Sequence, residues 1–518
     1  MKVLKSVLIY SAITLAVLVG LSVILFGIMY FFPSIRIFNL GLIHYNKTIE
    51  SEEIDLDEIN SFDNIQININ SKSLDVQVMP CEIYDIDDEG EKIEGQLSNI
   101  IDANLKLRIF GLTSDITEYN LSDDYEVINN TLHITYTVTE PDGWISKSGS
   151  EVVVNVPYNF KYNLNVTTDN GNIHLGNKDC RMNLNALSID TKKGELSFEN
   201  LCDREEDEIV WDYLNLNFEQ GDVDFSSISN VNVNTHTTLT GKNTRFKFKN
   251  LFSAVNIAGN NISLDAQIIS CDDGFNFITD KAKLDIEKLE AYNASEFSIV
   301  TCDCDADITK IDGDISIVTT TGKVKLGIVS GECNIDGNKA YIEITNVKDD
   351  LNINSNAGNV CVKNYERNGF FVINSGSLAA SNNSELYTNI MTSVTANNAI
   401  IKVSNNVNLL ELSAKGESSV DVTFKEIANM SFEHKVELGT DCSGIVYLPT
   451  SNFDKPFKFV ARGNISGQIV GVNSGTYVTS SDDPQYFPSS STEDIEKASN
   501  NCSFVFNGTI KFAGYSGK

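Results

Sequence analysis

Residues 163–175 are NLNVTTDNGNIHL, and residues 315–326 are ISIVTTTGKVKL. In both stretches apolar residues alternate with polar ones up to a glycine, and the alternation then resumes. Alternation with a period of two is typical of a strand with one buried face, and glycine suits the tight turn between two strands. Each stretch therefore predicts two short strands joined by a turn.

Similar units recur from about residue 164 onward. Examples are SIDTKKGELSFENL, LNLNFEQGDVDF, LNINSNAGNVCV, FVINSGSLAA and LELSAKGESSVDV. The turn glycines are Gly171, Gly194, Gly221, Gly241, Gly322, Gly358, Gly376 and Gly416, and candidates for intervening turns are Asn261, Asn338 and Asn397. The spacing centres near about 20 residues, a period that indicates a solenoid.

One such unit cannot bury its apolar face alone, but stacked units about 4.8 Å apart would bury it in a continuous column. The alternative is a large antiparallel sandwich of hairpins, whose turns also favour glycine. Sandwiches show turns every 8–12 residues or so, and the longer period here favours the solenoid. The predicted fold class is all-β: an elongated β-solenoid, or β-helix-like, repeat domain with short strands, preceded by one N-terminal transmembrane helix.

Residues 6–32 are uncharged and mostly apolar, and about 20 apolar residues suffice to cross a bilayer as a helix. Lys2 and Lys5 precede them, which predicts a cytoplasmic N-terminus and an extracytoplasmic C-terminal domain. A cleaved signal peptide is the alternative. Its apolar part is usually about 7–15 residues long and ends at a small-residue cleavage site, whereas FFPSIRIF follows here. The sequence therefore predicts a single-pass protein of the cell membrane.

Changes in pattern divide the chain into segments. In chain order we expect a cytoplasmic tip and transmembrane anchor (1–36), a stalk or linker (37–60), an N-terminal β region with acidic loops (61–160), β-solenoid repeats of about 20 residues (161–474), an exposed Ser/Asp/Pro-rich loop (475–500) and a C-terminal strand or cap (501–518).

The chain is strongly acidic, with 39 Lys and Arg against 71 Asp and Glu and a formal charge of −32. Binding to a nucleic-acid backbone needs clustered Lys and Arg, so we expect no nucleic-acid partner. An anionic lipid surface would repel the part of the chain beyond the anchor. Contact with the membrane is therefore expected through the N-terminal helix alone.

Two stretches resemble a known family. FDNIQININSKSLDVQVMP (62–80) is similar to the opening strands, and VPYNFKYNLNVTTDNGNIHLGN (156–177) to a recurring stretch, of the bacterial DUF4097 "putative adhesin" domain. The resemblance extends weakly over about residues 62–420, and the acidic loops at 83–100 and 203–209 depart from it. It implies a membrane-anchored, surface-exposed, β-solenoid-like protein. It implies no defined chemistry, so no catalytic residue is carried over from it.

Asp303, Asp305 and Asp307 form a D-x-D-x-D motif, and three carboxylates on one face of a strand are candidate ligands for Ca²⁺. The alternative, which the sequence favours, is a solvated outer face, because Ile308 occupies the position of the glycine in an EF-hand loop. The motifs H-E-x-x-H, G-x-S-x-G and G-x-x-x-x-G-K-[ST] are all absent from the sequence. We predict neither a catalytic site nor a cofactor other than this candidate Ca²⁺.

Ten cysteines are spread along the chain. Cys180 and Cys202 follow Gly171 and Gly194 at similar distances, so in a solenoid they would stack in neighbouring coils as a candidate disulfide. Buried thiols are the alternative. Cys302 and Cys304 are expected on one strand face, but no second cysteine pair completes a zinc site.

These observations favour an adhesin-like binding protein of the cell surface without enzymatic activity, whose ligand is a surface glycan or protein. One alternative is an envelope scaffold or sensor that assembles with membrane partners. Another is a polysaccharide-active β-helix enzyme, for which the sequence offers too many carboxylates to single out a catalytic pair. Fold analogy alone separates the three.

Overall fold

The computed structural model describes residues 2–31, 36–37, 40–59, 62–81, 84–86, 92–97, 99–113, 118–177, 180, 182–199, 208–291, 296–382, 390–406, 409–425, 433–449, 457–462, 465–468, 476–479, 485–487 and 503–515. The chain divides into two compact units, Met1–Ile228 and Ser229–Lys518.

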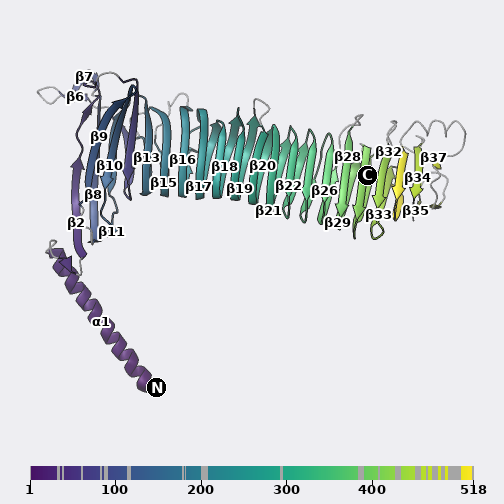
Figure 1. Cartoon of the computed structure of the whole chain (residues 1–518), viewed down its shortest axis with the longest axis horizontal. Helices are drawn as coiled ribbons and strands as arrows, with labels where there is room; N and C mark the ends of the chain where they lie inside the picture. The colour runs from purple at the N-terminus through teal and green to yellow at the C-terminus, as the bar shows by residue number, and fades with distance from the viewer. Residues whose placement is uncertain are drawn as a thin grey trace. The chain divides into compact units, whose positions relative to one another are not determined.

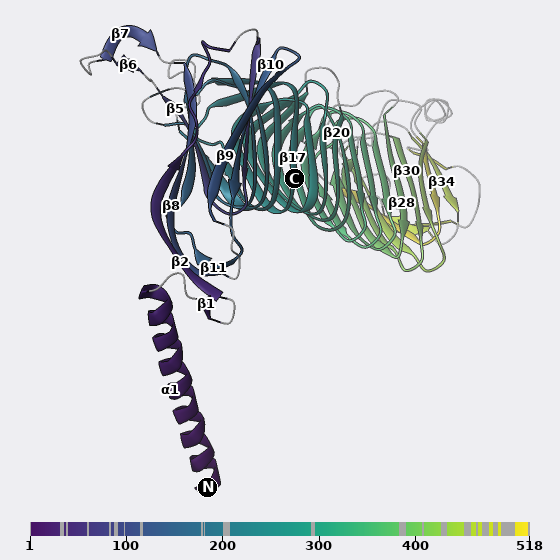
Figure 2. The same cartoon turned by 60° about the vertical axis from the view of Figure 1, so that its left-hand side comes forward.

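The first unit contains one helix and the strands up to β16 (Figure 2). Its elements are α1 (Lys2–Phe31), β1 (Arg36–Ile37), β2 (Leu40–Glu50), β3 (Ile54–Asp55), β4 (Asn64–Ser71), β5 (Asp75–Cys81), β6 (Tyr84–Ile86), β7 (Lys92–Leu97), β8 (Ile100–Thr113), β9 (Asn120–Ile128), β10 (Thr131–Thr139), β11 (Gly143–Ser146), β12 (Glu151–Pro157), β13 (Tyr162–Asn170), β14 (Ile173–Leu175), β15 (Leu184–Phe198) and β16 (Glu208–Asp224).

Parallel ladders form the solenoid part of the first unit. β4 pairs with β13, β13 with β15, and β15 with β16, all in parallel. Antiparallel strands precede this stack, because β2 pairs with β8, β8 with β12, and β9 with β10. An open end of a parallel stack would leave a free edge. The antiparallel strands cover it, and β12 and β10 join them in parallel to β5 and β4.

The structure corrects the expectation of a stalk over residues 37–60. Within this range β2 is an eleven-residue strand that pairs antiparallel with β8 from Gly41 to Glu50, and β3 pairs with the other end of β8. The reason is that β8 is a long strand whose backbone N–H and C=O groups need hydrogen-bond partners along its edge. β2, which follows closely after the helix, supplies these partners.

The helix α1 is long and apolar enough, over Ser11–Tyr30, to cross a membrane. A signal sequence near an N-terminus meets the same criteria of length and composition. At the C-terminal end of the helix, the rings of Phe26 and Tyr30 lie 5.5 and 6.4 Å from the ring of Phe110 on β8. Within the first unit, aromatic contacts therefore link the helix to the strand that β2 covers.

The second unit begins with long strands and continues with pairs of short ones (Figure 1). Its strands are β17 (Asn230–Phe252), β18 (Val255–Cys271), β19 (Phe275–Ala291), β20 (Glu296–Asp312), β21 (Asp314–Val329), β22 (Cys333–Gly337), β23 (Tyr341–Val347), β24 (Leu351–Ser355), β25 (Asn359–Val362), β26 (Gly369–Ile373), β27 (Gly376–Ser381), β28 (Met391–Asn397), β29 (Ala399–Asn406), β30 (Leu409–Lys415), β31 (Ser419–Phe424), β32 (Glu433–Leu438), β33 (Ser443–Pro449), β34 (Phe457–Arg462), β35 (Ile465–Gln468), β36 (Thr476–Thr479), β37 (Gln485–Phe487), β38 (Ser503–Asn507) and β39 (Ile510–Tyr515).

These strands pair in parallel, coil upon coil, and bury continuous columns of side chains. One column is Phe277, Ile299, Ile317, Ile335 and Ile353, which are in register and at most 3% exposed. The parallel ladders confirm the predicted β-solenoid and exclude the antiparallel sandwich of hairpins for this unit. Alternation then leaves the residues between the buried ones on the outer face of each strand.

The turn glycines of the first unit are required by close approach of the backbone. A Cβ on Gly194 would lie 2.1 Å from the carbonyl oxygen of Gly171, and a Cβ on Gly221 would lie 1.9 Å from that of Gly194. Such contacts are far inside van der Waals separation. The expected positive φ occurs at other turns, for example at Gly322 and Gly376 in the second unit.

The structure also corrects the C-terminal end of the stack. Residues 501–518 are predicted to form a C-terminal strand or cap, and they do form the strands β38 and β39. They do not cap the last coil, because β38 pairs in parallel with both β32 and β34, and β39 with both β33 and β35. The last coil is therefore β34 and β35. It is edged by antiparallel β37 and β36, which lie within the range expected to be an exposed loop. Antiparallel pairing protects a free parallel edge.

Candidate functional site

A shallow groove of about 280 Å³ lies on the outer face of β21, β22, β24 and β26 in the second unit. Two rows of outward residues line it. The first row is Ser316, Asn334, Asn352 and Phe370, and the second is Val318, Asp336, Asn354 and Val372. These eight residues are called the groove below.

The local sequence explains why these side chains face outward. In each of the four strands, the buried residues flank the first-row residue, as Cys333 and Ile335 flank Asn334, and Leu351 and Ile353 flank Asn352. Parallel pairing then places equivalent residues of successive coils side by side, 18 residues apart in sequence. Strand alternation and the repeat length together build the two rows.

Hydrogen bonds between coils orient the amide groups of the groove. Nδ2 of Asn352 donates to Oδ1 of Asn334 at 2.8 Å and to Oε1 of Glu332, at the border of the groove, at 3.1 Å. Nδ2 of Asn354 donates to Oδ1 of Asp336 at 3.2 Å. Among the described residues, no protein group donates to the other oxygen of Asp336 or to the side-chain amide oxygens of Asn352 and Asn354, so these atoms stay available as acceptors.

Apolar side chains flank these amides. Val318 and Val372 are 43% and 40% exposed, and Phe370 is half-buried at one end of the first row. The second row continues in register from Val318 to Val300 on β20 and to Ile278 on β19, and both of these side chains are also well exposed. A surface that combines exposed apolar side chains with a few oriented polar groups is typical of binding sites.

The D-x-D-x-D residues lie on β20 of the same unit but on another face of the solenoid. Asp303, Asp305 and Asp307 are exposed. Oδ1 of Asp303 accepts a hydrogen bond from Thr321 at 3.1 Å, and Oδ2 of Asp307 accepts one from Lys325 at 2.7 Å. In the described parts of the chain, no group of three His, Cys, Asp or Glu residues is arranged to hold a metal ion. The Ca²⁺ site stays a prediction.

The proposed disulfide falls partly outside the described residues. The backbone N–H of Cys180 donates to Oδ1 of Asn177 at 2.7 Å, whereas Cys202 is not among the described residues, so the pair stays a prediction. The expectation that Cys302 and Cys304 share one face is wrong, because Cys302 is exposed and Cys304 is buried. A corner at Cys302 and Asp303, both exposed in succession, shifts the alternation by one residue.

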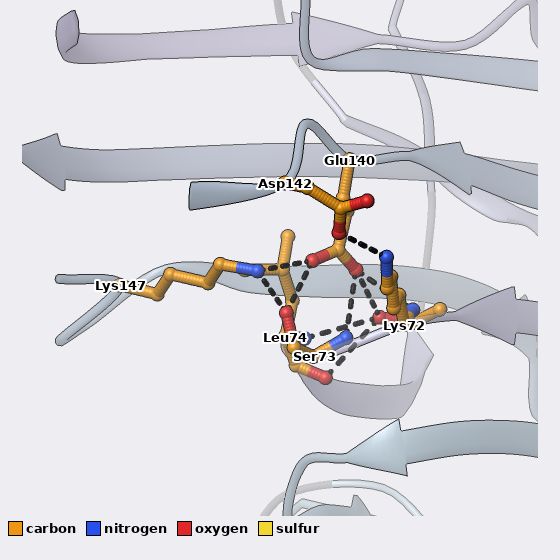
Figure 3. Close-up of polar contacts among 7 residues, drawn as sticks. Lys72, Ser73, Leu74, Glu140, Asp142 and Lys147 are labelled. Carbon is orange, nitrogen blue, oxygen red and sulfur yellow. Dashed lines mark hydrogen bonds and ion pairs between the residues drawn. The ribbon is translucent and has the colours of Figure 1, made fainter. Parts of the chain in front are cut away.

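A buried carboxylate forms a second polar cluster, in the first unit (Figure 3). The side chain of Glu140 is 0% exposed. Its Oε1 accepts from the backbone N–H groups of Lys72 and Ser73 at 2.7 and 2.8 Å, and from the hydroxyl of Ser71 at 3.1 Å. Its Oε2 accepts from Lys147 at 2.7 Å and from the hydroxyl of Ser73.

Burial by itself would raise the pKa of Glu140, but the hydrogen bonds from Lys147 and Ser73 outweigh it and lower the pKa below the usual 4.5. Lys147 also contacts the hydroxyl of Ser73, an arrangement that resembles a Ser–Lys nucleophile pair. The hydroxyl of Ser73 accepts from Nζ of Lys147 and donates its own proton to Oε2 of Glu140, so the proton of Ser73 is directed to the carboxylate and not to the lysine. The cluster is therefore a latch between the turn after β4 and the segment after β10.

The sequence interpretation did not identify the groove. Its signal is the recurrence of Ser316, Asn334 and Asn352 at one position of an 18-residue period. That signal appears only after the turns are aligned in the correct register, and the sequence leaves several registers open. The Glu140 latch joins residues 67 positions apart, and no local sequence motif predicts this contact.

Comparisons with known proteins give the following results. No family model matches the sequence, so the resemblance to the DUF4097 domain stays a resemblance, and no curated protein matches it either. Among solved structures, the chain is similar to a "putative cell adhesion protein" from Clostridium sporogenes, with 10% identity, 90% of this chain and 100% of that chain covered, and a TM-score of 0.16.

A second similar structure is a "putative adhesin" from Parabacteroides merdae, with 11% identity, 70% of this chain and 97% of that chain covered, and a TM-score of 0.18. Scores at this level carry no argument about this chain.

Proposed function

We propose that this chain is a membrane-anchored, surface-exposed, adhesin-like binding protein that holds its ligand without enzymatic activity. The groove on β21, β22, β24 and β26 is the observation that carries the proposal. It is open, it repeats along the stack, and it combines oriented amides with exposed valines and a phenylalanine. A rigid scaffold that presents such a surface is suited to binding an extended partner.

The chemistry of the groove favours holding a ligand over transforming it. Amide and hydroxyl side chains do not ionise near neutral pH, and the groove has one carboxylate, Asp336. General acid–base hydrolysis of a glycan uses two carboxyl groups that flank the bond to be cleaved. Asp336 supplies one, and its Oδ1 already accepts a hydrogen bond from Asn354. The carboxylate of Glu332, at the border of the groove, already accepts one from Asn352.

The helix α1 supports the membrane part of the proposal, because it is long and apolar enough to cross a bilayer. With Lys2 and Lys5 on the cytoplasmic side, the solenoid would lie outside the cytoplasm. In that position the groove would be exposed outside the cell membrane, where a surface ligand can reach it.

The test uses the full chain in detergent micelles. Saturable binding is measured to isolated cell walls, to intact cells and to a panel of soluble polysaccharides, and the size of each polysaccharide is measured before and after incubation. Val318→Lys places a charge in the groove without touching the core. Ile400→Lys is the matched control, because Ile400 is 64% exposed on β29, outside the groove.

We expect saturable binding that Val318→Lys weakens about tenfold, which corresponds to about 1.4 kcal/mol, and that Ile400→Lys leaves unchanged. The polysaccharide should keep its size. A shortened polysaccharide would contradict the non-enzymatic role. If the Val318→Lys variant binds as tightly as the wild type, the groove is excluded as the binding site. If the protein binds none of the surfaces, the scaffold alternative is favoured.

A further inference from the structure

We propose that the groove binds a neutral, extended polysaccharide that runs along the stack and crosses β21, β22, β24 and β26. The inference rests on the proposed function and deepens it, because it names the class of ligand. Three properties of the groove carry it: its charge, its hydrogen-bonding groups and its regular spacing.

The charge of the groove excludes polyanions. None of its eight residues is Lys or Arg, its one charged side chain is the carboxylate of Asp336, and Glu332 lies at its border. The whole chain carries 71 acidic against 39 basic residues. A polyuronate, a phosphate polymer or a nucleic acid would therefore meet repulsion without a compensating cation. A neutral polymer meets none.

The hydrogen-bonding groups match hydroxyls. Among the described residues, Nδ2 of Asn334 has no protein acceptor and Oδ1 of Asn352 has no protein donor, although Asn352 uses both of its own N–H groups. The groove thus offers donors and acceptors side by side, with the second oxygen of Asp336 as a further acceptor. A sugar hydroxyl both donates and accepts, so it can satisfy neighbouring groups of opposite kind.

The apolar residues match the other face of a sugar. A pyranose ring presents C–H groups above and below its plane, and these pack on aromatic and aliphatic side chains. Phe370 ends the first row, and Val318 and Val372 stand at either end of the second row with 43% and 40% of their surface exposed. An aromatic surface beside oriented amides gives a sugar both contacts at once.

The spacing of the groove favours a polymer. Parallel strands repeat at about 4.8 Å, and the period of 18 residues brings Asn334 and Asn352 to the same position on successive coils. A ligand built from repeated units meets the same kind of group at each coil. The exposed Val300 and Ile278 continue the second row on β20 and β19, so a longer chain gains further contacts there.

The experiment is isothermal titration of the full chain in detergent micelles with purified oligosaccharides of two to eight units. The neutral probes are gluco-, xylo-, manno- and N-acetylglucosamine oligomers, and the anionic probe is oligogalacturonate. The test variants are Phe370→Ala and Asn334→Ala. The matched controls are Tyr341→Ala on β23 and Asn359→Ala on β25, which are exposed residues on another face of the same coils. Thermal unfolding checks that each variant folds.

We expect at least one neutral oligomer to bind, with affinity that rises with length until the chain spans the groove. Phe370→Ala should weaken it by about tenfold or more, Asn334→Ala by about threefold to tenfold, and the two control variants by less than twofold. Binding of oligogalacturonate alone, or equal affinity of the wild type and Phe370→Ala, would overturn the inference.

Two further outcomes separate this inference from the proposed function. If cell-wall binding is lost in Val318→Lys but no neutral oligomer competes for it, the ligand class is wrong and the binding role stands. If cell-wall binding is also absent, both are wrong. Light scattering provides the remaining check, because a dimer that Phe370→Ala dissociates would show that the groove binds a second copy of this chain, which overturns the glycan inference.

Discussion

The amide nitrogen of Asn352 donates a hydrogen bond to the amide oxygen of Asn334 on the preceding coil, at 2.8 Å. The bond joins two residues 18 positions apart, on the outer face of β24 and β22. It fixes the orientation of both amides, and among the described residues it leaves Nδ2 of Asn334 and Oδ1 of Asn352 without a protein partner. The same hydrogen bond therefore stabilises the packing of successive coils and orients the amide groups of the groove that we propose binds the ligand.

Asn352→Ala should lower the free energy of unfolding by about 0.5–1.5 kcal/mol, because it removes two hydrogen bonds from a half-buried amide. Denaturant titration of the second unit's cooperative transition measures the change. Asn276→Ala, at an exposed position of β19, is the comparison. A loss as large in Asn276→Ala as in Asn352→Ala would show that the amide hydrogen bonds between coils have no special role.

Glu140→Gln should destabilise the first unit, because it removes the negative charge that accepts hydrogen bonds from Lys147, Ser73 and Lys72. Breaking a buried ion pair usually costs about 3–5 kcal/mol, and the partial exposure of Lys147 places this loss near the lower end. Asp142→Asn is the control, since Asp142 pairs with Lys72 in the solvent. Equal unfolding midpoints for the two variants would contradict the latch.

The same carboxylate predicts a pH dependence. The pKa of Glu140 is lowered in the folded chain, so the unfolded chain takes up a proton first as the pH falls. The stabilisation from Glu140 is complete above about pH 4.5 and is lost as the pH falls through the folded pKa. Unfolding measured from pH 7 to pH 3 should show this loss in the wild type and a flatter profile in Glu140→Gln.

His434 predicts a second acid-sensitive contribution, in the second unit. It is buried, it stacks on Phe504, and its Nδ1 accepts from the backbone of Leu410 at 3.1 Å. Burial lowers the pKa of His434 to about 3. The unfolded chain binds this proton near pH 6.5, so stability falls as the pH drops from about 6.5 toward 3.

The measurement for His434 is the unfolding midpoint at a series of pH values for the wild type, His434→Gln and the exposed control His236→Gln. His434→Gln should have lower stability at pH 7 and a smaller change between pH 6.5 and pH 4. A wild-type profile that is flat over this range, or one that His434→Gln leaves unaltered, would contradict the assignment.

Gly194→Ala should destabilise the first unit by about 1–3 kcal/mol or more, because its Cβ would lie 2.1 Å from the carbonyl oxygen of Gly171. Gly439→Ala is the matched control, since its Cβ would meet its nearest neighbour at 3.5 Å. Thermal unfolding compares the two. A neutral Gly194→Ala would show that the turns have room to separate.

Much of the fold follows from the sequence because strand alternation and turn glycines are local signals. Ile315, Ile317 and the turn at Gly322 mark their strands without reference to the rest of the chain. The order of strands is a different matter. That β38 lies between β32 and β34 depends on a long-range choice among similar edges, and the sequence of residues 503–507 carries no mark of its partner.

The site was less accessible to sequence reasoning for the same reason. The Asp303–Asp307 motif is prominent in one dimension, but its neighbours in the stack are Thr321 and Lys325. The groove has no motif at all in one dimension. It arises when Asn334, Asn352 and Phe370 are brought side by side by pairing of strands 18 residues apart.

The most direct measurement of the central claim is a crystal structure of the full chain with a neutral hexasaccharide that binds it in solution. The account predicts density for the sugar chain along the outer face of β21, β22, β24 and β26, with a ring against Phe370 and hydroxyls at Asn334 and Asn352. Density on another face, or a complex in which the groove holds a second copy of the protein, would contradict it.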